Sequence, residues 1–225
     1  MTSRLAFALA AALLAGLACG KNPYIAEVGG AILPEADRAS DVPGGLPVIV
    51  VKTTTDEKKL ALTAGPARVA IDRSVSWVRV LPFLQRLKAA GVKPVFLTGY
   101  RDEARAFVPT DVISDKPPIT IDVNRAGDFC ISPPTGFYDI PVSIGEPAKG
   151  ENIESICIET DMISISRANV REAMREAIKQ YGVTEVMIRM DEQAAWLDMV
   201  KAVDGVRTCC GKTAMKAAVA GMPTF

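Results

Sequence analysis

The sequence predicts an α/β fold, with α+β as the alternative, made of two small related domains. Each domain is expected to be a short mixed sheet with one or two helices on one face. Short β-branched runs alternate with segments whose apolar residues recur at helical spacing. The segment 69–84 recurs in diverged form as 188–203, which indicates an internal duplication. Hydrophobic residues make up 49% of the chain, enough for buried cores.

Residues 1–18 have the layout of a secretory signal peptide. Arg4 supplies a positive charge, the run from Leu5 to Ala15 is apolar, and small residues precede Cys19. This run is shorter than the ~20 apolar residues that a membrane-spanning helix needs. The expectation is therefore cleavage after Ala18 rather than an uncleaved anchor.

Cys19 would stand first in the cleaved chain. The stretch Leu17-Ala18-Cys19-Gly20 resembles the lipobox of bacterial lipoproteins, although Gly16 occupies a position where that pattern prefers Leu. The resemblance implies lipid attachment at Cys19 and an exported protein on the periplasmic face of a bacterial membrane. It favours the outer membrane, because Gly rather than Asp follows the Cys. Plain secretion with a free Cys19 is the alternative.

The charge balance and the residue types exclude several classes of function. Lys and Arg number 26, as do Asp and Glu, and cleavage would remove only the charge of Arg4. Such a chain has no field of one sign to attract nucleic acid or an anionic membrane face. It contains no His, which excludes Ser-His and Cys-His nucleophile systems and His-based zinc sites. We expect no enzyme activity, no catalytic residues, no cofactor and no metal site.

Four further cysteines are candidates for disulfide bonds: Cys130, Cys157, Cys209 and Cys210. An even number of cysteines outside the cytoplasm indicates disulfides, and three pairings are possible. A bond between the neighbours Cys209 and Cys210 would close a strained ring, so each is expected to pair with Cys130 or Cys157. The neighbours lack the two-residue spacing of thioredoxin-like redox sites, which favours structural disulfides.

The predicted elements follow in chain order. Residues 19–45 mix Gly, Pro and charge without a period, which predicts a lipid-tethered linker. The first domain, 46–115, is expected to open with a strand at 47–51, a hairpin partner at 59–63 and a strand at 68–72.

A helix is predicted next, because apolar residues recur at helical spacing. They are Trp77, Val80, Leu81, Leu84 and Leu87. Pro82 either kinks this helix or marks its first turn, and Gly91 is its expected end. Residues 92–98 then return to strand, which completes a strand-helix-strand crossover.

The second domain, 116–225, follows a similar pattern. Its expected elements are a hairpin of 119–123 and 129–131, a strand at 155–159, a helix between Ser166 and Gly182, a strand at 183–190, and a helix with a buried face of Trp196, Met199, Val200 and Val203 that ends at Gly205. A phosphate-loop interpretation of 205–216 is rejected, because five residues separate Gly205 from Gly211 where that loop has four.

The repeat aligns VAIDRSVSWVRVLPFL with IRMDEQAAWLDMVKAV. Asp72 falls on Asp191 and Trp77 on Trp196, so that both tryptophans of the chain keep the register. The two carboxylates could form a catalytic pair. However, each Asp follows a strand and precedes a helix, where an Asp accepts backbone N–H bonds worth ~1 kcal/mol. Helix capping is therefore the expected role.

The repeated unit resembles the soluble periplasmic domain of the ExbD/TolR biopolymer-transport proteins. Residues 69–99 are similar to its second half, an apolar strand ending in Asp, a helix ending in Ala-Gly and a closing strand. Residues 155–203 are similar to a fuller unit that lacks the final strand. Asp41-Val42-Pro43 and Asp139-Ile140-Pro141 resemble the segment that those proteins place just outside the membrane. The family's transmembrane helix, and the Asp in it that couples to the proton gradient, has no counterpart here.

Together these features predict a non-enzymatic cell-envelope lipoprotein with two ExbD/TolR-like domains. The resemblance implies binding to envelope proteins of a Tol/Ton-type system or to peptidoglycan, as an accessory without energy coupling. The alternative is a secreted structural or carrier domain unrelated to such transport. An envelope hydrolase or redox enzyme is a third class, which the missing histidines disfavour.

Overall fold

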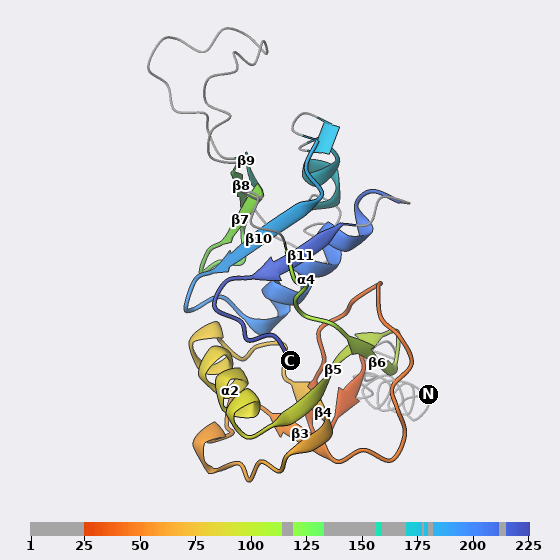
Figure 1. Ribbon diagram of the computed structural model, residues 1–225, viewed down its shortest axis with the longest axis vertical. Coiled ribbons are helices and arrows are strands. Elements are labelled where there is room, and N and C mark those ends of the chain that lie inside the picture. The colour runs from red at the N-terminus through yellow and green to blue at the C-terminus, as the bar shows by residue number, and fades with distance from the viewer. Residues whose placement is uncertain are drawn as a thin grey trace, which may run out of the picture.

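The computed structural model shows two units, each a sheet with helices. The second unit lies above the first in Figure 1. The structure describes residues 25–113, 119–132, 156–158, 170–176, 178–179, 182–211 and 215–225. The prediction of an α/β fold of two small sheet-based domains is confirmed. The signal peptide, Cys19 and the segment Asp139-Ile140-Pro141 lie outside the described residues.

The first unit is a four-stranded sheet of order β3-β4-β5-β6. Its elements are β3 (Val48–Val51), η1 (Glu57–Lys59), β4 (Gly65–Ile71), α2 (Trp77–Ala89), β5 (Val92–Tyr100) and β6 (Glu103–Phe107). Strands β3, β4 and β5 are parallel, and β6 returns antiparallel to β5. Helix α2 connects β4 to β5, as the crossover pattern predicts. Strand β6 has no counterpart among the predicted elements.

The second unit is a five-stranded sheet of order β11-β10-β7-β8-β9. Its elements are β7 (Ile119–Val123), β8 (Phe129–Ser132), β9 (Ile156–Ile158), a helix at 170–176, β10 (Glu185–Met190), α4 (Trp196–Thr208) and β11 (Lys216–Val219). Strands β7, β10 and β11 are parallel, and β7 and β8 form the predicted hairpin. Both units therefore share three parallel strands with a helix after the middle one.

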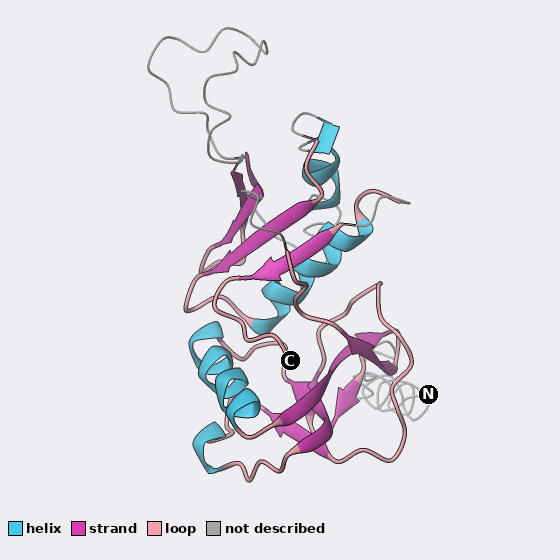
Figure 2. Ribbon diagram, in the orientation of Figure 1, coloured by secondary structure: helices cyan, strands magenta, loops and turns pink. Residues whose placement is uncertain are grey.

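The first sheet has a buried layer on each face. Because side chains alternate along a strand, Val69 and Phe96 pack in the core that also contains α2, while Ala70 and Leu97 face the opposite side. Burying each large side chain of this kind stabilises the fold by about 1.5–3 kcal/mol. Figure 2 shows α2 on one side of the first sheet and the N-terminal segment on the other.

That N-terminal segment corrects the prediction of a linker at 19–45, because its described part is folded. Strands β1 (Glu27–Val28) and β2 (Ala31–Ile32) form a two-stranded sheet. The chain then bonds to the first sheet, with Ala36 N donating to Gly99 O at 3.1 Å and a bridge between Ser40 and Ala106. Four small or apolar side chains are buried there: Ala26, Ala31, Leu33 and Ala36. Their alternation with Gly, Pro and charge conceals the strand pattern.

The predicted hairpin partner at 59–63 is also wrong. Residues 57–59 form the 3-10 helix η1, and Asp56 accepts a hydrogen bond from Lys58 N at its start. Strand β3 instead pairs with β4 in parallel, which requires a crossover rather than a tight turn.

Two predictions near the end of the chain are corrected as well. Helix α4 does not end at Gly205 but continues to Thr208, because Val206 is buried in the core and the buried Asp204 and Arg207 have hydrogen-bond partners around that glycine. The second unit does not lack its final strand, since β11 pairs in parallel with β10. Its sequence, Lys-Ala-Ala-Val, has one β-branched residue, so the strand depends on its position in the sheet more than on propensity.

The first helix agrees with its prediction. Helix α2 begins at Trp77 and buries Val80, Leu84 and Leu87, and Gly91 follows it at φ +70°, a conformation that glycine adopts without strain. Pro82 lies inside the helix rather than in its first turn.

Candidate functional site

Asp72, the first residue of the repeat motif, shapes the turn after β4. Its Oδ1 accepts hydrogen bonds from Ser74 N at 3.0 Å and from Ser74 Oγ, and its Oδ2 accepts one from Ile32 N at 2.9 Å. Burial alone would raise the pKa of Asp72, but these hydrogen bonds and the charge of Arg73 outweigh it. The pKa therefore lies below its ordinary value of 3.8.

Asp191 occupies the same place after β10. Its Oδ1 accepts a hydrogen bond from Gln193 N at 2.7 Å. The helices begin later, with Ser76 and Ala195 at their N-cap positions, so the prediction that Asp72 and Asp191 cap them is wrong. Each Asp instead closes a turn through the amide two residues ahead.

The two turns bind to each other through the tryptophans. Trp77 N donates to Ala194 O at 2.8 Å, and Trp196 N donates to Val75 O at 2.8 Å. The repeat alignment places Trp77 on Trp196 and Val75 on Ala194. The two bonds are thus the same contact made twice, in opposite directions.

A second pair of bonds has the same relation. Val78 N donates to Glu192 O at 2.8 Å, and Leu197 N donates to Arg73 O at 3.0 Å. The alignment places Val78 on Leu197 and Arg73 on Glu192. All four donors lie in the first turns of α2 and α4, where a helix has no internal acceptors for its N–H groups.

Ser76 and Ala195, also equivalent in the repeat, form an antiparallel bridge at the centre of this contact. A self-complementary interface around a central pair is the geometry of a two-fold symmetric dimer. The duplicated units therefore dock onto each other about an approximate two-fold axis through Ser76 and Ala195.

The tryptophan rings lie in the shared core. Trp77 is 4% exposed and Trp196 is fully buried. The ring of Trp196 lies 6.0 Å from that of Phe96 on β5, in the other unit. Trp196 thus packs between the two units as well as beneath its own helix.

The cysteines separate into two groups. Cys130 on β8 is disulfide-bonded, and Cys157 lies opposite it in the register of β8 and β9. Cys209 and Cys210 are bonded to each other, so the expected pairing of each with Cys130 or Cys157 is wrong. The fold explains this difference, because β8 pairs with β9 at one edge of the sheet, while Cys209 and Cys210 follow α4, which connects β10 to β11 at the other edge.

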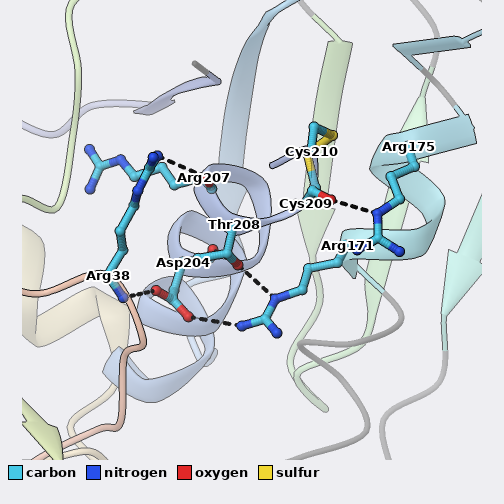
Figure 3. The surroundings of a disulfide bond; sticks show 8 residues. All are labelled: Arg38, Arg171, Arg175, Asp204, Arg207, Thr208, Cys209 and Cys210. Atoms are coloured by element: carbon cyan, nitrogen blue, oxygen red, sulfur yellow. Dashed lines mark hydrogen bonds and ion pairs between the residues drawn. A yellow bond between two sulfur atoms is a disulfide. The ribbon is translucent and has the colours of Figure 1, made fainter. Parts of the chain in front are cut away.

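Charged side chains gather around the same end of α4 (Figure 3). Asp204 is fully buried, and its Oδ1 accepts hydrogen bonds from Asp37 N at 3.1 Å and Arg38 N at 2.9 Å. Its Oδ2 lies 3.6 Å from the guanidinium of Arg171, which also donates to Thr208 Oγ1 at 2.6 Å. Asp204 thus joins the N-terminal segment and the 170–176 helix to α4.

Two more arginines complete this cluster. Arg175 donates to Cys209 O at 2.6 Å, at the negative end of the helix dipole. Arg207 is paired with Asp111 at 2.9 Å and also donates to Val108 O. Asp111 in turn accepts a hydrogen bond from Ala217 N at 2.9 Å on β11. Arg207 and Asp111 thus hold the segment that connects the two sheets against the end of α4. Their role is structural.

The outer side of α2 is open by contrast. A groove of about 500 Å³ lies between α2 and η1. It is lined by Glu57, Lys58, Val78, Arg79, Pro82, Phe83, Gln85, Arg86 and Ala89. Val78, Pro82, Gln85 and Ala89 are exposed along one face of the helix, Val78 to 42%. This concave, mainly apolar surface is a candidate binding site.

The groove has a basic rim held by hydrogen bonds. Arg79 donates to Thr55 O at 2.6 Å and is paired with Glu57. Arg86 donates to Glu57 O and to Leu60 O. These contacts attach η1 to α2 and keep the groove walls in place.

Sequence reasoning did not select any of these groove residues as a site. The available signals were Pro82, which a helix interior disfavours, and Val78, which lies outside the apolar stripe of α2. Neither signal identifies a binding site, because the sequence does not show which segments pack on the outer side of α2.

Within the described residues, no group of three or more acidic or cysteine side chains is placed to hold a metal ion. The described helices are also too short or too polar to cross a bilayer. Comparisons with models of known families, with curated proteins and with solved structures find no match.

Proposed function

We propose that this chain is a non-enzymatic cell-envelope binding protein, attached by lipid at Cys19 to the periplasmic face of a bacterial membrane. Its two domains would bind envelope proteins or peptidoglycan, as an accessory to a Tol/Ton-type machine. The ExbD/TolR resemblance of the repeated unit and the signal peptide support the location and the partners. The groove on α2 supports the binding role and is the observation that carries it.

The position of the folded N-terminal segment also supports this proposal. Residues 25–45 pack on the first sheet, and Asp37 and Arg38 bond to Asp204 of the second unit. The stretch 20–24 is then all that separates Cys19 from the folded body. Because an extended chain spans at most ~3.6 Å per residue, a lipid on Cys19 would hold the body within about 20 Å of the membrane surface.

The use of charged groups within the fold is consistent with binding rather than catalysis. Asp72 and Asp191 serve turns, and Asp204 serves a junction of three segments. These carboxylates accept backbone hydrogen bonds, which fixes them in structural roles.

Crosslinking in intact cells tests the proposal. Wild-type protein should fractionate with membranes and should crosslink to a Tol/Ton component or to peptidoglycan. Cys19→Ala should release it from the membrane and reduce the crosslinked yield. Recovery of neither kind of partner would overturn the envelope-binding role, and unchanged fractionation of Cys19→Ala would overturn lipid attachment.

A further inference from the structure

The two units differ in what covers the outer side of their central helices. In the second unit the 170–176 helix lies beside α4. Its Arg171 contacts Asp204 and Thr208, and its Arg175 contacts Cys209. Figure 3 shows this helix against the last turn of α4, with both arginines pointing toward it.

The covering helix also contributes apolar side chains to the core. Val170 and Met174 are fully buried, and Ile178 packs against the same cluster. Their i, i+4, i+8 spacing marks one face of a helix. In the second unit, therefore, an amphipathic helix covers the last turn of α4.

The repeat shows that the first unit lacks this cover at equivalent positions. The alignment places Gln85 on Asp204 and Ala89 on Thr208. Gln85 and Ala89 are exposed and line the groove on α2. The end of the groove at Gln85 and Ala89 thus occupies the place that the 170–176 helix fills in the second unit.

The chain connections explain the difference. Between β7 and β10 the second unit has β8, β9 and the 170–176 helix, whereas between β3 and β4 the first unit has only η1. Strand β3 accordingly pairs with β4 alone among the described strands, while β7 also pairs with β8. Within the part of the chain that the structure describes, the end of α2 at Gln85 and Ala89 is therefore open where the end of α4 is covered.

The charge of the groove differs from that of the covered face. Lys58, Arg79 and Arg86 line the groove with a single acidic residue, Glu57. On α4 the equivalent wall contains the carboxylate of Asp204, which faces Arg171 of its covering helix. An occupant of the groove should therefore bring acidic rather than basic side chains.

We propose that the groove on α2 binds an amphipathic helix of a partner protein, with apolar residues at i, i+4 and i+8 and acidic residues beside them. The bound helix takes the position that the 170–176 helix has in the second unit. This inference rests on the proposed binding function and adds the surface and the chemistry of the partner. Such helix-in-groove recognition uses one apolar face and its flanking charges.

Titration with a synthetic helix tests the proposal directly. The probe copies residues 166–182 with Arg167→Glu, Arg171→Glu and Arg175→Glu, which makes its net charge negative. The control peptide keeps the native, net positive sequence. We expect saturable binding of the probe to the purified full chain, at least about tenfold tighter than binding of the control. A tenfold difference in affinity corresponds to about 1.4 kcal/mol of binding free energy.

Substitutions in the protein locate the site. Val78→Glu and Lys58→Glu should each weaken binding of the probe by about tenfold or more. Val112→Glu, at another exposed valine, and Lys93→Glu, at another exposed lysine, are the matched controls and should leave it unchanged. Absence of saturable binding overturns the inference, as does equal binding of both peptides or an equal effect of groove and control variants. Circular dichroism checks that each variant is folded.

A photo-crosslinker at Gln85, compared with one at Val112, separates this inference from the proposed function. Envelope partners trapped by the wild-type protein but never through Gln85, together with failure of the probe to bind, would refute the groove and leave the function intact. Binding of the probe without any envelope partner in cells would refute the function and leave the groove.

Discussion

Trp77 and Trp196 each donate their backbone N–H group to the turn that precedes the other's helix, at 2.8 Å in both directions. Because the two residues are equivalent in the repeat, this reciprocal contact makes the two units a pseudo-symmetric pair within one chain. The repeat motif thus has a structural purpose, which is to hold the two copies together. Trp196 adds a ring contact to Phe96 across the same interface.

The lowered pKa of Asp72 predicts a pH-dependent contribution to stability. A carboxylate with a lowered folded-state pKa stabilises the fold above its unfolded-state pKa, and this stability is lost as pH falls through the folded-state value. Asp72→Asn should therefore lower the free energy of unfolding by about 1 kcal/mol at pH 7. The deficit should shrink below about pH 4. Urea titrations at several pH values measure it, and a deficit that stays constant down to pH 3 would contradict this account.

Asp204 should be far more important for stability than its repeat equivalent, Gln85. Asp204→Ala leaves the amides of Asp37 and Arg38 without their acceptor. It also removes the buried carboxylate that lies 3.6 Å from the guanidinium of Arg171, so we expect a loss of about 3 kcal/mol. Gln85→Ala, at an exposed site, should cost less than about 0.5 kcal/mol. Chemical denaturation gives both values. Equal losses in the two variants would show that the buried junction is not what stabilises the end of α4.

The cysteines should divide into the same two groups in solution. Peptide mapping without reduction should recover Cys209 and Cys210 in one peptide that gains two hydrogens on reduction. It should also recover Cys130 linked to the peptide that contains Cys157, its register partner. A peptide joining Cys209 or Cys210 to Cys130 would contradict the structure.

The two disulfides should also differ in how much stability the protein loses when each is removed. A bond between neighbours closes almost no loop, so Cys209→Ser with Cys210→Ser should change stability by less than about 1 kcal/mol. Cys130→Ser should cost about 2–4 kcal/mol, the usual value for a disulfide that closes a longer loop. Thermal unfolding of the variants compares the two. A large loss of stability in the double serine variant alone would reverse this assignment.

Local patterns were sufficient to predict much of the fold. The apolar period of α2, the glycine after it, and the β-branched runs of β3, β4, β7 and β10 gave correct elements, because these segments bury one face against a core. The repeat of Asp72 and Trp77 at 191 and 196 predicted the duplication. Its consequence, the docking of one copy onto the other, depends on backbone hydrogen bonds, which leave no trace in side-chain pattern.

The errors have similar causes. Strand β11 is short and half Ala, and the N-terminal strands β1 and β2 have only two residues each, so tertiary contacts rather than propensity decide them. Gly205 failed to end α4 because the burial of Val206 and the hydrogen bonds that Asp204 accepts outweigh the cost of a helical glycine, about 1 kcal/mol. The groove on α2 was invisible for another reason: it exists because a helix present in one copy is missing from the other.

Amide hydrogen exchange at the pairing of the two copies tests the central claim most directly. The N–H groups of Trp77, Val78, Trp196 and Leu197 lie in first helical turns, where amides without acceptors exchange rapidly. If the copies bind reciprocally, all four should be protected to a degree comparable with the amides of β4 and β10. Rapid exchange of these four amides, with the strands still protected, would contradict the docking of one copy onto the other.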